Sequence, residues 1–537
     1  MILAETLRKA VKFFPGKQAI VCGQNRWTYQ EFSDRINRLS RCLNYLEAGK
    51  GDKVAILLPN CHYFLEAYYG ISQIGAISVP INYRLSPTEI KFILQDSESK
   101  ILIADPTFRE EVNACAEEGH GIEKILWTGE EKGSNRFSNK KEANRGKGRD
   151  FDYEFALRQS DSHALPEPGI IDEDIAQIYY TSGTTGRPKG VMLSHRNVCT
   201  HALGAIAEIH LTDSDVWAHV APLFHLADAW ATWSITWVGG THVLLRDFAP
   251  RVVLETIERE KVTVTNLIPT MLNLMVNHPD VGKYDFRSLR VLLSGGAPIA
   301  PEVVRKVLEI FRCDYVQTYG MTETSPYLTL SILKEHLRRL SYEDQLRFKS
   351  KTGREFISVE LKVVNDRGEE INRDEKEVGE IIVRGDIVTK GYWKLPEETE
   401  KSIRDGWLYT GDLAVMDEEG YVTIVDRKKD MILTGGENVY STEVENVLYM
   451  HPAILECAVI GVPDQKWGEA VKGMVVLKSG EKATEEEIIR FCKERMAHYK
   501  APKSIDFIDA LPRTGSGKIH KKELRDRYWA GYEKRVH

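Results

Sequence analysis

The chain has 537 residues, which corresponds to several domains at ordinary domain sizes of roughly 100 to 200 residues. Lysine and arginine total 72 and aspartate and glutamate total 79, so the formal net charge is −7. With 42% hydrophobic and 28% charged residues, the composition is typical of a globular protein with a substantial core. The acidic balance argues against a nucleic-acid binder held by bulk phosphate attraction.

The eight cysteines never fall in a CxxC spacing, so neither a disulfide framework nor a tetrathiolate zinc site is expected, and a reducing, cytoplasmic compartment is the simpler prediction. The amino terminus carries Glu5 and several basic residues where a signal peptide needs an unbroken apolar stretch. The most apolar region, 215–240, is interrupted by His219, His225 and Asp228, so no transmembrane segment is predicted.

The first predicted elements alternate between helix and strand. Thr28 and Glu31 have capping-box spacing, and the apolar residues that follow recur at helical intervals: Phe32, Ile36, Leu39, Leu43 and Leu46. A short apolar run at 52–60, a helix-like segment at 62–75 and a second apolar run at 76–84 come next. Strand, helix and strand at this spacing predict a parallel sheet with crossover helices.

Residues 129–150 are nearly free of large apolar side chains, so burial cannot offset the entropy of ordering them. We interpret this segment as a solvated surface insertion, with an acidic partner for its basic residues as the alternative.

The strand rhythm returns at 262–269, 290–298 and 314–320, so the chain to about residue 420 is predicted to be layered α/β. Two alternating strands at 456–464 and 473–480 and a helix at 485–496 then predict a small α+β unit. The expected fold is therefore a large α/β amino-terminal domain followed by a smaller carboxy-terminal domain.

The segment 179–194, YYTSGTTGRPKGVMLS, is the most informative part of the sequence. Its glycines let the backbone approach a ligand closely, its hydroxyls offer hydrogen bonds and Lys189 adds positive charge, a combination suited to phosphate. Lys189 follows a proline and precedes a glycine, so the segment lacks the spacing and the magnesium-binding hydroxyl of the Walker pattern. A P-loop kinase or GTPase is therefore disfavoured.

TSGTTGRPKGV also resembles the signature of the adenylate-forming superfamily, which contains acyl-CoA synthetases, adenylation domains of peptide synthetases and beetle luciferases. Further motifs follow in that family's order: PLFH at 222–225, SGGAPI at 294–299, YGMTET at 319–324, GEIIVRG with GYW at 379–393, WLYTGDLA at 407–414, DRKKDMILTGGENVYSTEVE at 426–445 and PRTGSGKIHKKELR at 512–525. The resemblance covers nearly the whole chain, with fatty-acid and related acyl-CoA ligases as its nearest group.

The resemblance implies a site for ATP or AMP and for Mg²⁺. It assigns the segment from Thr181 to Lys189 to the β- and γ-phosphates. This segment includes Ser182, Gly183, Thr184 and Thr185. It implies a backbone strip beside adenine at Gly295, Gly296 and Ala297, and an adenine-facing ring at Tyr319, next to Gly320. Thr322 is expected near the α-phosphate and Glu323 at the magnesium ion, while Asp412 and Arg427 are expected at the ribose.

The resemblance further implies that Lys518, flanked by glycines, is the catalytic lysine of adenylation. It divides the chain into an AMP-binding domain at 1–425, a hinge at 426–430 and a carboxy-terminal domain at 431–537 that swings between two poses. The pivot corresponds to Lys429, where many acyl-CoA synthetases carry aspartate. The resemblance also places Gly435, Gly436 and Glu437 on the pantetheine path.

The acyl pocket is implied to lie beside His225, the family's gate-like residue. Trp230, Trp233 and Trp237 recur at i, i+3 and i+7, so in a helix they share one face, either as core packing or as a wall of this pocket. A bulky wall at Trp230 favours a short, medium-length or aromatic acid over a very long chain.

The function implied is an ATP-dependent acyl-CoA ligase of fatty-acid or related metabolism, with CoA as co-substrate and a homodimer as one possible assembly. One alternative is an adenylating enzyme that loads a separate carrier protein, since only 19 residues follow Lys518 and no carrier domain fits there. A luciferase-like oxygenase shares the same motifs. A non-catalytic nucleotide sensor is disfavoured because Lys518 and Glu323 are both present.

Overall fold

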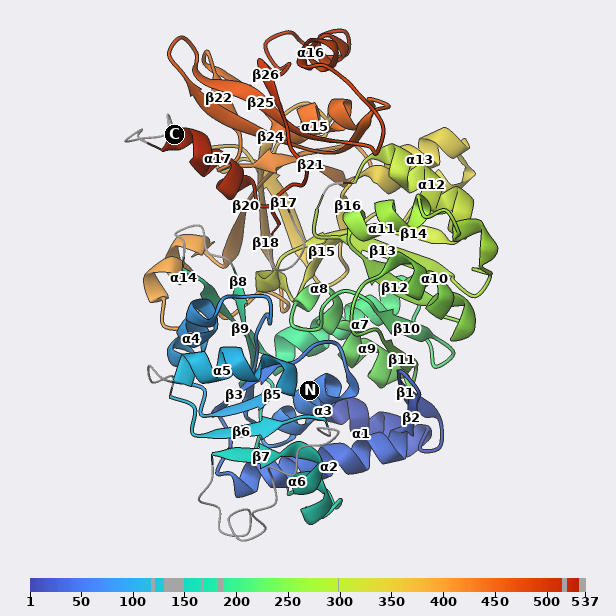
Figure 1. The fold of residues 1–537 in the computed structure, drawn as a ribbon, viewed down its shortest axis with the longest axis vertical. Coiled ribbons are helices and arrows are strands. Elements are labelled where there is room, and N and C mark those ends of the chain that lie inside the picture. The colour runs from blue at the N-terminus through green and yellow to red at the C-terminus, as the bar shows by residue number, and fades with distance from the viewer. Residues whose placement is uncertain are drawn as a thin grey trace.

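The computed structural model describes residues 1–116, 121–129, 149–166, 168–181, 187–297, 299–513 and 519–530. This part of the chain has a mixed α/β fold with a large amino-terminal domain and a smaller carboxy-terminal domain, which lies at the top of Figure 1. The predicted fold class is confirmed. In the same residues, no helix is both long and apolar enough to cross a bilayer.

A seven-stranded sheet in the described residues has the order β7-β6-β5-β3-β4-β8-β9. Its strands are β3 (Lys53–Leu57), β4 (Ile77–Pro80), β5 (Ile101–Ala104), β6 (Lys124–Trp127), β7 (Asp150–Asp152), β8 (Ile175–Thr181) and β9 (Lys189–Ser194). All neighbours are parallel except β8 and β9, which form an antiparallel pair on either side of the predicted phosphate loop. The predicted parallel pairing of the first two strands, β3 and β4, is confirmed.

A fourteen-stranded sheet, again counted in the described residues, has the order β17-β18-β20-β21-β16-β15-β14-β13-β12-β10-β11-β1-β2, with β19 beside β20. One half contains β1 (Gln18–Cys22), β2 (Asn25–Thr28), β10 (Val216–His219), β11 (Thr241–Leu244), β12 (Val264–Leu267), β13 (Val291–Gly295) and β14 (Asp314–Gly320), all parallel except β2. The antiparallel half contains β15 (Tyr327–Leu330), β16 (Gly353–Glu355), β17 (Glu360–Val364), β18 (Gly379–Arg384), β19 (Ile403–Arg404), β20 (Trp407–Met416) and β21 (Tyr421–Arg427).

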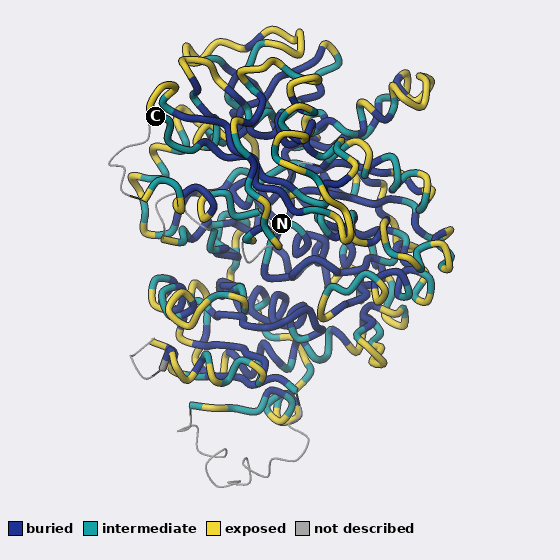
Figure 2. Tube along the Cα trace, turned by 45° about the horizontal axis from the view of Figure 1, so that its top comes forward, coloured by how far each residue is buried: buried dark blue, intermediate teal, exposed yellow. Residues whose placement is uncertain are grey.

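Helices cover these two sheets and bury the central strands, which appear dark blue in Figure 2. They are α1 (Ala4–Phe13), α2 (Tyr29–Tyr45), α3 (His62–Gln73), α4 (Pro87–Asp96), α5 (Arg109–Ala116), α6 (Tyr153–Gln159), α7 (His195–Ile209), α8 (Leu226–Ala229), α9 (Ala231–Val238), α10 (Pro250–Arg259), α11 (Pro269–Val276), α12 (Pro301–Phe311), α13 (Tyr342–Ser350) and α14 (Pro396–Ser402). Single turns of 3₁₀ helix are η1 (Pro106–Phe108), η4 (Val281–Lys283), η5 (Thr322–Thr324) and η6 (Leu337–Arg339).

Helix α2 begins at the predicted capping box. Thr28 Oγ1 accepts a hydrogen bond from the Glu31 N–H, and the Thr28 N–H donates to Glu31 Oε2 at 2.7 Å. Two otherwise unpaired backbone donors are satisfied in this way. The predicted apolar stripe of this helix, which includes Phe32 and Leu39, is buried in the largest core cluster.

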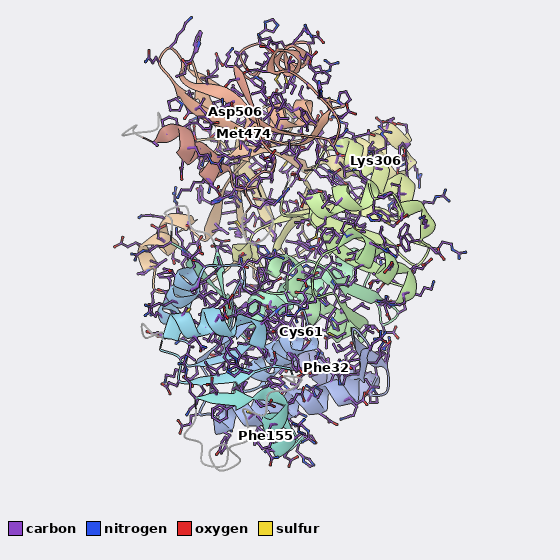
Figure 3. The ribbon with its side chains drawn as sticks, in the orientation of Figure 1. Phe32, Cys61, Phe155, Lys306, Met474 and Asp506 are labelled. Atoms are coloured by element: carbon purple, nitrogen blue, oxygen red, sulfur yellow. The ribbon has the colours of Figure 1, made fainter. Side chains whose placement is uncertain are left out.

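The smaller domain contains a five-stranded sheet, in the described residues, in which β23, β22, β25 and β24 are neighbours in that order and β26 pairs with β25. Its elements are β22 (Ile432–Thr434), β23 (Glu437–Val439), α15 (Ser441–Tyr449), β24 (Ile454–Asp464), β25 (Gly468–Leu477), α16 (Glu485–Lys493), β26 (Ser504–Phe507) and α17 (Lys521–Trp529). Figure 3 labels Met474 and Asp506, which are register partners on β25 and β26, in this upper domain, far from Phe32 and Cys61 below. The predicted strand pair and helix of this unit are confirmed.

Two details differ from the sequence prediction. Asp150, predicted to end the surface insertion, begins β7 and pairs with β6, while 130–148 lie outside the described residues. The segment from β15 to β21 is antiparallel and extends the parallel sheet, whereas layered α/β was expected there. Several consecutive strands there, such as β17 and β18 or β20 and β21, are antiparallel sheet neighbours, and such pairs need no crossover helix.

Candidate active site

The site lies where β13 and β14 end. A Cβ at Gly295 would lie 2.1 Å from Thr318 Oγ1, and one at Gly320 would lie 1.8 Å from the Pro326 carbonyl oxygen. Neither position has room for a side chain, because the neighbouring strand occupies that space. The Thr318 side chain alone therefore requires glycine at position 295, whether or not a ligand also approaches it. Gly296 and Ala297 follow at the strand end and are accessible to solvent.

Asp412 is held between two other predicted site residues. The Tyr319 hydroxyl donates to Asp412 Oδ2 at 2.7 Å, and Arg427 Nε lies 3.2 Å from Asp412 Oδ1. Asp412 and Arg427 are register partners on β20 and β21. The nearby carboxylate raises the pKa of the Arg427 guanidinium, and burial followed by the same carboxylate raises the pKa of Tyr319.

Glu323 lies in η5, directly after β14 and next to Thr322, and both residues are buried. The Tyr392 hydroxyl donates to Glu323 Oε1 at 2.9 Å, and the Thr389 N–H donates to the Glu323 carbonyl at 2.7 Å. Burial raises the pKa of the Glu323 carboxyl because desolvation disfavours its charged form. A bound cation would reverse that effect.

Lys189, at the start of β9, lies beside the same tyrosine. Its Nζ is 5.3 Å from the centroid of the Tyr392 ring and 2.5 Å from Glu398 Oε2. The loop that carries Tyr392 is fixed to β9, because the Trp393 N–H donates to the Gly190 carbonyl at 2.7 Å. Tyr392 therefore joins the lysine of the phosphate loop to the carboxylate predicted to hold a metal.

The rest of the predicted phosphate loop is only partly described. Thr181 ends β8 as the register partner of Lys189. Ser182, Gly183, Thr184, Thr185 and the predicted catalytic residue Lys518 lie outside the described residues.

The acyl-side residues lie at α8 and α9. His225 Nδ1 accepts from the Ala227 N–H at 3.1 Å and caps α8, which ends before Trp230. Trp230 packs against Tyr327, whereas Trp233 packs against Tyr69, with ring centroids 5.0 Å and 4.7 Å apart. Trp230 directly precedes α9, which contains Trp233 and Trp237, and Trp230 and Trp233 are fully buried, as the core-packing alternative expected.

The predicted hinge and CoA residues lie on the smaller domain's side of the site. Lys429 is in the turn between β21 and β22, where burial and the charge of Arg427 lower its pKa. Gly435 and Gly436 form the turn of the β22–β23 hairpin, and Glu437 begins β23. None of the contacts between described residues joins these three to Asp412 or Glu323.

Sequence reasoning missed two features of the site. Tyr392 was visible only as the middle letter of the GYW motif, with no role attached. The second is the contact between the two domains, where Asp426 accepts hydrogen bonds from the Ser441 N–H at 2.6 Å and the Ser441 hydroxyl at 3.1 Å. Both residues were inside a recognised motif, but no spacing indicated that they bind each other.

The chain matches the family model of the AMP-binding enzyme over residues 7–393 and that of the AMP-binding enzyme C-terminal domain over residues 443–518. It is 37% identical over 521 residues to feruloyl-CoA synthase of Amycolatopsis sp, covering 97% of this chain and 98% of that one. It is 34% identical over 524 residues to 4-hydroxybutyrate–CoA ligase 2 of Metallosphaera sedula, covering 97% and 93%.

Among solved structures, ATP-bound MatB from Rhodopseudomonas palustris has a TM-score of 0.84 at 29% identity, with 99% of this chain and 100% of that chain covered. The apo structure of MatB gives 0.74 at the same identity and coverage. The arrangement of this chain is therefore more similar to the ATP-bound structure.

Replacing Asp412 by asparagine tests the ribose assignment. A hydrogen bond to a charged group contributes about 1.5–3 kcal/mol, so Asp412→Asn is expected to raise the KM for ATP roughly ten- to hundredfold. The measurement is initial rate against ATP concentration at saturating acid. Tyr319→Phe, which keeps the ring and removes only one donor to Asp412, is the control and should change this KM by only a few fold. An unchanged KM in Asp412→Asn would contradict the assignment.

Proposed function

The chain belongs to the AMP-binding enzyme family and is an ATP-dependent acyl-CoA ligase, and from this premise we propose which residues carry each step. The enzyme activates a carboxylic acid as an acyl adenylate and then passes the acyl group to CoA. In the first step a carboxylate oxygen forms a bond to the α-phosphorus of ATP while the bond to pyrophosphate breaks. In the second, the CoA sulfur attacks the acyl carbon, and AMP leaves.

For the nucleotide, Asp412 accepts hydrogen bonds from the ribose hydroxyls and Arg427 assists it. Tyr319 and the strip at 295–297 bind adenine, and Thr322 donates to the α-phosphate. The β- and γ-phosphates bind to the loop from Thr181 to Lys189, with Ser182, Gly183, Thr184 and Thr185, and Gly320 leaves room for the turn beside it. The observation that carries this assignment is that Tyr392 contacts both Lys189 and Glu323, so phosphate and metal ligands have one common neighbour.

A screen of pyrophosphate release with acetate, hexanoate, palmitate, benzoate and cinnamate, each with ATP and CoA, tests this function directly. Pyrophosphate release that requires both ATP and one of these acids would support the ligase function.

We propose that Glu323 holds Mg²⁺ together with the ATP phosphates. The described residues contain no cluster of three or more His, Cys, Asp or Glu side chains able to hold a metal alone. Mg²⁺ usually binds through one or two carboxylates and substrate phosphates, so a single buried carboxylate fits that ion. When bound, the ion neutralises negative charge that develops on the phosphates.

Glu323→Gln is expected to raise the Mg²⁺ concentration that gives half-maximal ATP binding by about tenfold or more, since a neutral amide is a weaker ligand for a hard cation. Calorimetric titration of ATP at several Mg²⁺ concentrations measures this. Tyr392→Phe keeps the carboxylate and serves as the control. Equal Mg²⁺ dependence in Glu323→Gln and the native protein would exclude Glu323 as a ligand.

Lys518 is proposed to stabilise the charge that develops between the acid and the α-phosphate. Its loss should cost about 3 kcal/mol in the transition state, or about a hundredfold in the rate of adenylate formation. Lys518→Ala should therefore abolish most acid-dependent ATP–pyrophosphate exchange and spare thioester formation from a supplied acyl adenylate. Lys522→Ala, an exposed neighbour in α17, is the matched control. Unchanged exchange in Lys518→Ala would disprove this role.

We propose that the domains divide at a hinge over 426–430 and that the small domain turns about Lys429 between the two steps. Asp426, on β21, contacts Ser441 at the start of α15, and Lys521 Nζ donates to Ser441 Oγ at 2.7 Å. The bonds between Asp426 and Ser441 cross the hinge, so they have to break when the domain turns, whereas the Lys521–Ser441 bond lies within the small domain. The higher TM-score with ATP-bound than with apo MatB supports their belonging to the arrangement for adenylation.

Asp426→Ala should consequently slow adenylate formation about tenfold more than it slows thioester formation from a supplied adenylate, because it weakens only one arrangement. The two half-reactions are measured separately on the same preparation. Asp506→Ala, which removes an acid paired with Lys472 within the small domain, is the control. An equal loss of rate in both half-reactions would mean that Asp426 contributes only to the stability of the fold.

For the acyl and thiol groups, we propose His225 as a gate and Trp230 as a wall that favours a short, medium-length or aromatic acid. The relatives named for 4-hydroxybutyrate and for a feruloyl group support this choice. Gly435, Gly436 and Glu437 are proposed to line the pantetheine path after the small domain turns. All eight cysteines are free thiols and seven are buried, which supports a reducing, cytoplasmic location.

A further inference from the structure

The positive charge of Lys189 is paired with a carboxylate of the chain itself. Its Nζ lies 2.5 Å from Glu398 Oε2, although 209 positions separate the two residues in the sequence. The side chains of Lys189 and Glu398 are 13% and 29% exposed, so both charges are largely shielded from water. Salt and water therefore screen this ion pair less than they screen a pair on the open surface.

Backbone contacts hold the two partners together. The loop before α14 is paired with β9, because the Trp393 N–H donates to the Gly190 carbonyl at 2.7 Å. Helix α14 is fixed to this loop in turn, since Thr399 Oγ1 accepts from the Tyr392 N–H at 3.0 Å, and Figure 1 shows the helix beside β8 and β9. Glu398 directly precedes Thr399, so its carboxylate is held beside the lysine by the fold and does not meet it through flexible segments.

The Lys189 ammonium has limited room for an anion. An ammonium group has three donors, one of which is used by Glu398. The Tyr392 ring, with its centroid 5.3 Å from Nζ, covers another side. Two oxygens bonded to one nitrogen lie about 5 Å apart or closer, so a phosphate at Lys189 meets the negative charge of Glu398. Its binding either brings two like charges together or requires that the ion pair break.

A second lysine gives Glu398 a partner that remains when Lys189 is taken by another anion. Lys401 Nζ lies 3.1 Å from Glu398 Oε1, the oxygen that does not contact Lys189. Lys189 and then Lys401 lower the pKa of the Glu398 carboxyl, so it is ionised near pH 7. The carboxylate can therefore give up Lys189 without losing all of its compensating charge.

On the basis of the proposed binding of the β- and γ-phosphates at Lys189, we propose that Glu398 competes with these phosphates for the lysine and so sets the affinity for ATP and pyrophosphate. ATP binds by exchange, in which a phosphate oxygen replaces Glu398 at Lys189 and Glu398 keeps Lys401. After the anhydride forms, the reverse exchange favours the departure of pyrophosphate. AMP and the acyl adenylate have neither phosphate, so Glu398 does not oppose their binding.

Calorimetric titrations of ATP, pyrophosphate and AMP, each with Mg²⁺, compare the native protein with Glu398→Gln, which removes the charge and keeps the size of the side chain. The Kd values for ATP and pyrophosphate should fall about tenfold in this variant, because one repelling charge is gone. The Kd for AMP should stay within about twofold, because AMP lacks the phosphates that bind Lys189. Pyrophosphate should also inhibit the variant at about tenfold lower concentration in steady-state assays.

Glu397→Gln is the matched control. Glu397 is in the same first turn of α14 and is exposed. Adjacent residues of a helix do not face the same direction, so this substitution removes the same charge from the same turn but away from Lys189. It should leave the Kd values for ATP, pyrophosphate and AMP unchanged.

The outcomes separate this inference from the function on which it rests. An unchanged or higher Kd for ATP in Glu398→Gln overturns the inference, as does an equal change for AMP or the same change in Glu397→Gln. In each of these cases the ligase function stands if the native enzyme releases pyrophosphate with ATP and an acid. If the native protein binds neither ATP nor AMP, the proposed function itself is overturned, and the inference falls with it.

Discussion

The geometry of the site depends on the carboxylate of Asp412 being held from two sides. Tyr319 belongs to the last parallel strand, β14, and Arg427 to β21 of the antiparallel half, with β15 and β16 between them in the sheet. The parallel half and the antiparallel half of the sheet must therefore be correctly placed for both residues to contact the Asp412 carboxylate. Arg427 also directly follows Asp426, which contacts Ser441 of the small domain. The proposed ribose site and the contact between the domains therefore depend on adjacent residues of one strand.

Three buried carboxylates near the site differ in how they are compensated. Burial raises the pKa of Glu323, Asp426 and Glu445 alike. Glu445 is 2.7 Å from Lys521 Nζ, and Asp426 accepts from Ser441, so both have partners within the fold. Glu323 receives one neutral hydroxyl and the more distant charge of Arg427. This imbalance supports our proposal that Glu323 is the carboxylate that binds Mg²⁺.

The parts of the structure that could be predicted from the sequence depend on local patterns. The capping box at Thr28 and the run of parallel strands follow from spacing and hydrophobicity, which act over a few residues. The antiparallel extension could not be predicted, because alternation indicates strands but not the neighbours they choose. In the same way, GYW could be recognised only as a family motif, while the contact of Tyr392 with Lys189 and Glu323 depends on a loop docking against β9.

Several buried polar groups next to Trp230 are paired within the fold. Asp228 Oδ2 lies 2.6 Å from His219 Nδ1, and the chain of hydrogen bonds continues through fully buried partners, His242 and Thr236. Trp217, which packs on Trp230, also donates to Asp228.

His195, six residues before His201 on the same helix, accepts from the Leu3 N–H at one ring nitrogen, whereas His201 has neither nitrogen bonded within the described residues. One helix thus carries two fully buried histidines, and the one without any bonded nitrogen is the one facing Trp230.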